Sequence, residues 1–251
     1  FFNIFFKTSN LKQISGFTFF ASLILGLGIT SLIFYISLNI NFLNNSFPYI
    51  FDVFLLLIIL LIKQQNIIEP VTIPDSIIIG KRNYYARFIL TFILFVSAIT
   101  IFTLTSISNP HGVSDTFFQW NLRAKFMFLP KEEWKQIFLI PQDYLVKSYP
   151  LLLPGTIARI WKYMNNDAIF VYQIVSIFFS FSLAGMLFYS FKTLNSLFKG
   201  YISIILLMGT PMFLQMIPGQ FADMPISLFI FSSLFFCIYL IYIPKITNIQ
   251  F

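Results

Sequence analysis

Long apolar runs without a single charge constrain this chain more than any other feature. The clearest run extends from Phe17 to Ile40 and can cross about 30 Å of hydrocarbon at about 1.5 Å per residue. Over the whole chain, 58% of the residues are hydrophobic and only 10% are charged, which is far from the composition of a soluble domain. The sequence therefore predicts an all-α polytopic membrane protein.

Six apolar runs are predicted to form membrane spans within a single transmembrane domain, residues 1–251. The runs lie near residues 17–40, 47–62, 87–106, 168–189, 201–217 and 225–243. The second run is short and carries Asp52 near its start, so we expect it to be tilted or packed against a neighbour. The chain opens on Phe1 and stops just past a span, so we expect a fragment of a longer polytopic protein.

The distribution of lysine and arginine predicts the orientation. The basic residues at the short connections fall on one face: Lys7, Lys12, Lys63, Lys81, Arg82, Arg87, Lys192, Lys199 and Lys245. The opposite short connections, 41–46 and 218–224, contain none, and short basic connections are retained in the cytoplasm. We therefore expect a cytoplasmic N-terminus in the cell membrane, with the long connection 107–167 outside. The net charge of +7 belongs largely to this pattern and does not indicate nucleic acid.

The long outer connection holds a polar stretch, NPHGVSDTFFQWNLRAKFMF, that spans residues 109–128. From Asp115, the apolar residues Phe118, Leu122 and Phe126 recur at helical spacing, which predicts an amphipathic helix with these three on its apolar face. Gln119 and Arg123 fall close to Asp115 on that helix. All three tryptophans, Trp120, Trp134 and Trp161, lie in this connection, as is typical of a segment at the headgroup boundary. We expect two or more interfacial helices, one of them running through Arg159 and Trp161.

A second carboxylate, Asp223, opens the sixth predicted span within the turn 219–225 and is expected on the same face as Asp115. Folding can bring the two acids to one site. Each acid also fits a simple helix-capping role, and Arg123 and Lys125 also fit contacts with lipid headgroups. The lone His111 suits a turn beside Gly112 better than a metal site. The single cysteine, Cys237, excludes a disulfide framework.

Several short motifs resemble the glycosyltransferase C-fold superfamily. They are Gly112-Val-Ser-Asp115, Trp120-Asn121-Leu-Arg123-Ala-Lys125, Tyr149-Pro150 and Ala222-Asp223-Met-Pro225. More narrowly, the stretch from Ile107 to about Phe231 is similar to bacterial membrane proteins related to dolichyl-phosphate-mannose protein mannosyltransferases and lipid A aminoarabinose transferases. The chain departs from this pattern in carrying a lone Asp115 where some members have two adjacent acids. It also has two additional spans before the motif loop.

The resemblance implies transfer of a sugar from a polyprenyl-phosphate donor to a lipid, glycan or protein acceptor on the outer face. Asp115 would act as the general base, and Asp223 would orient acceptor or sugar, or bind a divalent metal if one is used. A departing phosphate needs positive charge, which the forked guanidinium of Arg123 supplies with support from Lys125. The expected substrate-binding residues are Gln119, Trp120, Asn121, Arg123, Lys125 and Tyr149.

Two other classes of protein have similar hydropathy. A transporter or lipid flippase places functional charges and broken helices near the bilayer midplane, whereas here the charges gather near the span ends. A non-catalytic membrane subunit would need no convergence of acids and bases. The gathering of polar residues on one face favours the interfacial enzyme.

Overall fold

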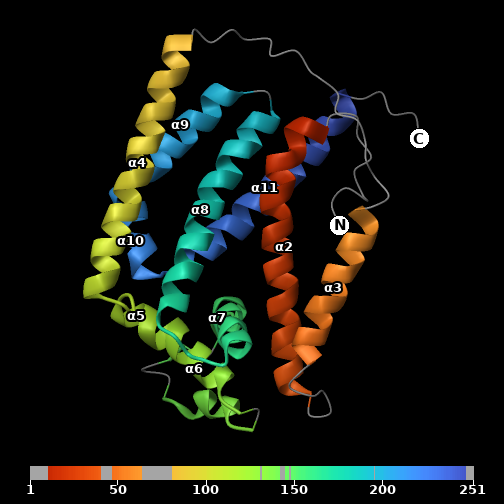
Figure 1. The fold of residues 1–251 in the computed structure, drawn as a ribbon, viewed down its shortest axis with the longest axis vertical. Helices are drawn as coiled ribbons and strands as arrows, with labels where there is room; N and C mark the ends of the chain where they lie inside the picture. The colour runs from red at the N-terminus through yellow and green to blue at the C-terminus, as the bar shows by residue number, and fades with distance from the viewer. Residues whose placement is uncertain are drawn as a thin grey trace.

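The computed structural model describes residues 11–40, 47–63, 81–130, 132–141, 145–146, 148–194 and 196–246. Within these ranges every regular element is a helix (Figure 1). The predicted spans correspond to α2 (Leu11–Asn39), α3 (Phe47–Lys63), α4 (Lys81–Ser108), α8 (Phe170–Thr193), α9 (Leu197–Met208), α10 (Pro211–Gly219) and α11 (Asp223–Ile246). The all-α architecture is confirmed for the described part of the chain.

In the part of the chain that the structure describes, three helices are long and apolar enough to cross a membrane. These segments are Gly16–Asn39 in α2, Tyr85–Ser108 in α4 and Phe170–Thr193 in α8, and the count rises to four if α9 and α10 form one bent span. Shorter apolar helices cover Phe47–Ile58 in α3 and Asp223–Tyr239 in α11. The chain is therefore a membrane-spanning protein, and the six-span count stays a prediction.

The fifth predicted span, 201–217, is wrong as a continuous helix. It divides into α9 and α10, whose axes differ by 66°. The break falls at Thr210, which is extended at φ −81° and ψ 119° and precedes Pro211. Proline has no N–H to continue the helix and its ring disfavours helical geometry at the residue before it, so the chain turns here. After this bend, α10 ends beside the outer segment, where Gly219 contacts Thr116.

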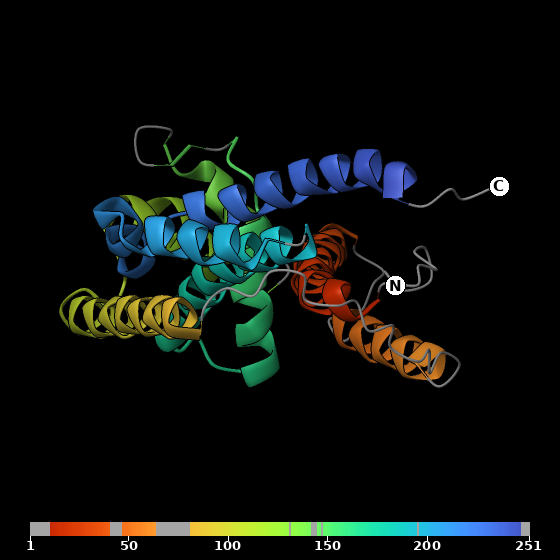
Figure 2. The same cartoon turned by 90° about the horizontal axis from the view of Figure 1, so that it is seen from above.

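Helix α8 occupies the centre of the bundle. It packs against α2, α9, α10 and α11. Half of the residues in its apolar 18-residue stretch are buried inside the protein, compared with 11% in the corresponding stretch of α4. Helices α3 and α4 lie on opposite sides of the bundle when it is seen from above (Figure 2). The Phe20 ring of α2 packs directly against α8 at Gly185. A side chain at position 185 would overlap this ring. Residues Trp161, Phe179, Ile217 and Leu228 are fully buried in the common core.

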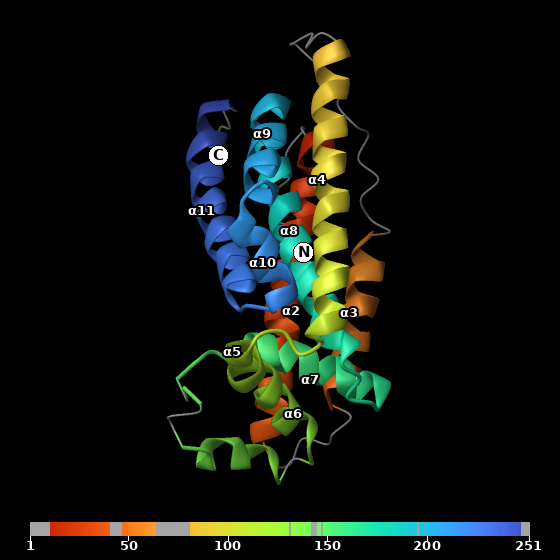
Figure 3. The ribbon, with the colours of Figure 1, turned by 90° about the vertical axis from the view of Figure 1, so that its left-hand side faces the viewer.

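The outer segment folds as a layer of short helices across one end of the bundle (Figures 1 and 3). It contains α5 (Ser114–Thr116), the wide π-helical turn η1 (Phe117–Asn121), α6 (Leu122–Phe128), the 3₁₀ turn η2 (Trp134–Leu139) and α7 (Leu152–Met164). The expected helix through Arg159 and Trp161 is confirmed as α7. The α10–α11 turn lies at this same end, as do the end of α4 and the start of α8.

The predicted apolar face of the first outer helix is wrong. Phe118 is 41% exposed, while the polar Thr116, Gln119, Asn121 and Arg123 are buried. The π-helical turn adds a residue between α5 and α6, so a uniform 3.6-residue period does not describe this helix. Consequently its buried side is polar and aromatic.

The three tryptophans of the outer segment are buried inside the protein rather than spread along a lipid boundary. Trp120, Trp134 and Trp161 are exposed by 6%, 1% and 0% respectively. The Trp134 indole donates to the Leu38 carbonyl at 3.2 Å, and the Trp161 indole donates to the Ala168 carbonyl at 3.0 Å. The rings therefore tie the outer layer to α2 and to the start of α8.

The orientation inferred from basic residues stays a prediction. Lys7 and the connection 41–46 lie outside the described residues, and so do the side chains of Lys12, Lys63, Lys81, Arg82 and Lys245.

Candidate functional site

The outer segment is attached to the α10–α11 turn by a set of contacts that we call the polar seam, formed by Thr116, Asn121, Gly219 and Gln220. The buried Thr116 hydroxyl donates to the Gly219 carbonyl at 2.6 Å. Gly112 adopts φ +72°, and a Cβ there would lie 2.7 Å from the same carbonyl oxygen. Glycine is thus required both by the backbone conformation and by the close approach.

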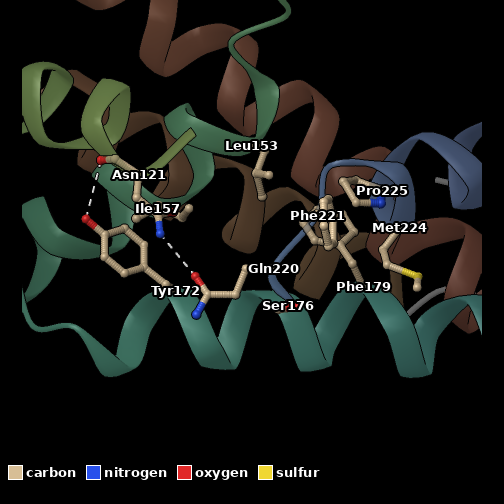
Figure 4. A pocket seen from close by; sticks show the side chains of 10 residues that line it. All are labelled: Asn121, Leu153, Ile157, Tyr172, Ser176, Phe179, Gln220, Phe221, Met224 and Pro225. Carbon is tan, nitrogen blue, oxygen red and sulfur yellow. Dashed lines mark hydrogen bonds between the residues drawn. The ribbon is translucent and has the colours of Figure 1, made fainter. Parts of the chain in front are cut away.

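Two side-chain amides form the second half of the polar seam (Figure 4). Asn121 donates to the Gln220 side-chain oxygen at 3.1 Å, and Gln220 donates to the Pro110 carbonyl at 3.1 Å. Tyr172 of α8 donates to the Asn121 carbonyl at 3.3 Å. Beside them lies a cavity of about 10 Å³, which is room for about one water molecule. Because Asn121 and Gln220 are only 1% and 4% exposed, their amides hold the fold together.

Arg123 holds the segment around Tyr149. Its guanidinium donates to the Tyr149 carbonyl at 2.9 Å and also to the Val146 carbonyl. Gln119 accepts a hydrogen bond from the Val146 amide at 2.9 Å. Burial lowers the pKa of Arg123 from its ordinary value, and the nearby Tyr149 opposes that shift. Arg123 is 2% exposed, so in this arrangement two of its nitrogens serve the backbone, and its phosphate-binding role stays a prediction.

Trp120 and Tyr149 stack face to face at the edge of an apolar cavity. Their ring centroids lie 5.1 Å apart with an interplanar angle of 8°. The cavity has a volume of about 210 Å³ and is lined by Trp120, Pro150, Ala222 of the α10–α11 turn, and residues of α11 that include Pro225, Ile226, Phe229 and Ile230. Its lining is almost purely apolar, as a hydrocarbon chain requires.

A second cavity of about 340 Å³ adjoins the first. Both are lined by Pro150 and Leu152, and the second continues along α2 at Gly28, Ser31, Leu32 and Tyr35. We call the pair the Pro150 cavities. Leu32 on α2 and Ile230 on α11 are 58% and 56% exposed, so these walls extend onto surfaces that face the apolar phase. The cavities therefore connect the Trp120–Tyr149 stack with the membrane-facing side of the bundle.

The two predicted acids are both exposed, and the segments that carry them lie against each other. Asp115 is the second residue of α5 and Asp223 the first residue of α11. The capping alternative for Asp115 does not hold, because Val113 occupies the cap position and α5 has no side-chain cap. Lys125 is half exposed and forms an ion pair with Asp167.

Several residues of this region were not found from the sequence. Thr116 and Gln220 carry no motif that marks them as contacts, and Gln220 adopts a left-handed backbone conformation at φ +59° without being glycine. The contacts of Asp52 of α3 were not found either: it accepts a hydrogen bond from Tyr163 and lies 3.8 Å from Arg159. These pairings span 111 and 107 residues respectively, beyond the reach of local pattern reading.

Within the described residues, no cluster of three His, Cys, Asp or Glu side chains forms a candidate metal site. His111 lies in the turn before α5, as its neighbours Pro110 and Gly112 indicated, with its ring against Phe117 at 5.5 Å.

No protein-family model, curated protein or solved structure matches this chain.

Proposed function

We propose that this chain is a membrane glycosyltransferase that moves a sugar from a polyprenyl-phosphate donor to a lipid, glycan or protein acceptor at the outer face. The observation that carries the proposal is the junction of the Pro150 cavities with the polar outer layer. A polyprenyl tail needs an apolar channel open to the bilayer, and its phosphate needs a polar site at headgroup depth. The two requirements meet at the Trp120–Tyr149 stack.

In this proposal Asp115 takes the proton of the acceptor hydroxyl. The hydroxyl oxygen forms the new bond to the anomeric carbon as the bond from that carbon to the phosphate oxygen breaks. The bonding electrons leave with the polyprenyl phosphate. Asp115 suits the role of base because its exposed carboxylate is accessible to an acceptor that arrives from the aqueous side.

The cations divide between two roles. Lys125 is the exposed cation of the motif and can exchange its Asp167 partner for a phosphate oxygen. Arg123 supports the site as a positioning residue, because it fixes the carbonyls of Val146 and Tyr149. Asp223 opens α11 at the same end of the bundle, where it is available to orient a sugar hydroxyl.

The bend between α9 and α10 is the one observation that favours a transporter or flippase, since broken helices are common in that class. In those proteins, however, the break typically brings charged or ion-coordinating groups to the bilayer midplane. Here the bend lies at Gly209–Thr210, and the charged side chains described on α4, α8, α9 and α11 lie toward the ends of these helices. The enzyme therefore remains the better supported proposal.

The test is the substitution Asp115→Asn in the full-length protein. The amide is nearly isosteric, so folding should persist, while loss of a general base should lower sugar transfer by about 10²- to 10⁴-fold. Transfer of radiolabelled sugar from polyprenyl phosphate, measured in membranes, provides the readout. Glu133→Gln is the matched control, because it neutralises an exposed acid of the same segment, and it should leave transfer unchanged. Wild-type transfer by Asp115→Asn would remove the catalytic assignment.

A further inference from the structure

A polar pocket distinct from the cavities described above lies where α2, α3 and α7 meet at the outer end of the bundle. It has a volume of about 40 Å³ and is lined by Phe34, Ser37, Leu38, Pro48, Tyr49, Arg159 and Lys162. One water needs about 10–15 Å³ on this measure, so the space admits about three groups of that size. The terminal oxygens of a phosphate group match that number.

Arg159 faces this pocket with unused hydrogen-bonding capacity. Its side chain is 13% exposed, and its Nε and Nη1 atoms are buried without a hydrogen-bond partner among the described residues. Among the described residues, the carboxylate paired with Arg159 is that of Asp52, which lies 3.8 Å from Nη1. This distance is too long for a hydrogen bond, and Asp52 already accepts one from the Tyr163 hydroxyl. Buried guanidinium donors without an acceptor are costly, so an oxyanion in the pocket would satisfy them.

Lys162 adds a second cation on the same helix, three residues after Arg159. Its ammonium group donates to the Leu129 carbonyl at 3.2 Å and lies 5.5 Å from the Phe128 ring centroid. Burial lowers the pKa of Lys162 from its ordinary value, which an adjacent anion would offset. Arg159 and Lys162 both line the pocket, and the carboxylate that lies beside it among the described residues is that of Asp52, so the local charge favours a negatively charged occupant.

This pocket is separate from the Pro150 cavities. It uses Phe34, Ser37 and Leu38 of α2, whereas the larger Pro150 cavity uses Gly28, Ser31, Leu32 and Tyr35. At 100° per residue these two sets are centred roughly 115° apart around the helix. An anion at Arg159 would therefore be distinct from the phosphate of a donor whose tail fills the Pro150 cavities.

We propose that Arg159 and Lys162 form a binding site for a phosphate group at the junction of α2, α3 and α7. The headgroup of an anionic phospholipid and free phosphate share this chemistry. Arg159 would supply two directed N–H groups, and Lys162 would supply the second charge. The apolar faces of Phe34 and Leu38 would form a wall for the attached glycerol. This proposal is independent of sugar transfer and can fail or succeed alone.

The test uses the delipidated full-length protein in a neutral detergent. Binding of dihexanoyl phosphatidylglycerol and of inorganic phosphate is measured separately by calorimetric titration, with dihexanoyl phosphatidylcholine as the zwitterionic comparison. Saturable binding of phosphatidylglycerol alone would assign the site to a lipid headgroup, and equal binding of inorganic phosphate would assign it to a free anion. Absence of saturable binding by both probes would overturn the proposal.

Arg159→Gln should weaken the binding by roughly 10- to 100-fold, because it removes charge-assisted hydrogen bonds. Lys135→Gln removes the same charge from an exposed position of the outer segment and should leave the affinity unchanged. Equal losses in the two variants would indicate diffuse electrostatic attraction and contradict a defined site. Unchanged affinity in a folded Arg159→Gln variant would contradict it as well.

Two further measurements keep the test decisive if Arg159→Gln does not fold. Lys162→Gln should also weaken binding, by several-fold, since it leaves the Arg159 fork in place. In the wild-type protein, the bound probe should slow hydrogen exchange in α7 and at the start of α3. Protection confined to other helices would place the phosphate elsewhere and reject this pocket.

Discussion

At the scale of single residues, Arg123 shows how a motif residue can serve the fold. The guanidinium lies 5.9 Å from the Tyr149 ring centroid and donates to two carbonyls of the neighbouring segment. Val146 and Tyr149 lie outside regular secondary structure, so side chains supply hydrogen-bond partners in addition to the Tyr149 amide, which donates to the Val146 carbonyl at 3.1 Å. A buried arginine meets that need because its planar fork presents several donors at fixed angles.

Arg123→Met tests this role. Methionine fills a similar volume but removes the guanidinium donors from the part-buried carbonyls of Val146 and Tyr149, at a cost of about 0.5–1.5 kcal/mol for each hydrogen bond. The thermal unfolding midpoint in detergent should fall by roughly 5 °C or more at a fixed scan rate. Arg123→Lys should give an intermediate fall, since it keeps the charge and loses the fork. Lys135→Met is the exposed control, and an equal midpoint in Arg123→Met and wild type would contradict the positioning role.

At the scale of elements, the outer layer and the α10–α11 turn depend on each other. The break at Thr210 redirects α10, so that Gly219 reaches Thr116 of α5. The turn before α5 closes through the Gly112 amide, which donates to the Asn109 carbonyl at 3.0 Å. This turn brings the start of α5 against Gly219 without room for a side chain. The placement of Asp115 and Asp223 at one end of the bundle thus rests on this junction.

Gly112→Ala should disrupt the junction. A left-handed conformation costs a non-glycine residue about 1–2 kcal/mol, and the added Cβ would lie 2.7 Å from the Gly219 oxygen. The unfolding midpoint should fall, and exchange of the amides around Thr116 should become faster. Gly26→Ala is the matched control because a Cβ there meets nothing within 4 Å. That control should be neutral or slightly stabilising, and similar falls in both variants would contradict a specific role for Gly112.

At the scale of the whole molecule, the two ends of the bundle differ, and the short polar helices lie at one of them. The short helices α5, α6 and α7 gather there, together with the α10–α11 turn (Figure 3). The pocket lined by Arg159 lies at the same end. The opposite end carries the connection between α8 and α9, with Lys192 and Lys199. This polarity agrees with a protein that works at one membrane surface and is anchored by the rest of its helices.

Cysteine labelling of intact cells tests the orientation. In a background with Cys237→Ser, Glu133→Cys should react with a membrane-impermeant thiol reagent, because it is exposed in the outer layer. Lys199→Cys, exposed at the opposite end, should react only after the membrane is permeabilised. The reverse pattern would invert the topology and place the outer layer in the cytoplasm.

The sequence by itself determined the membrane class and the approximate positions of α2, α4 and α8. Uncharged apolar runs must leave water, and in lipid their backbone groups are satisfied by helices, so a local pattern is sufficient to predict them. The break before Pro211 was missed, because the apolar run 201–217 reads as one span although proline disfavours a helix at the residue before it. The concentration of polar motif residues in the segment after Ile107 was also evident, because local composition can be read directly from the sequence.

Only the tertiary structure decided which of those residues are buried and what they contact. The π-helical turn altered the helical register and exposed Phe118, and no periodicity rule anticipates an extra residue in a helix. The contacts of Thr116 with Gly219 and of Asn121 with Gln220 join residues 103 and 99 positions apart. Such pairings depend on how whole helices pack, because buried polar groups accept whichever partners the packing brings within reach.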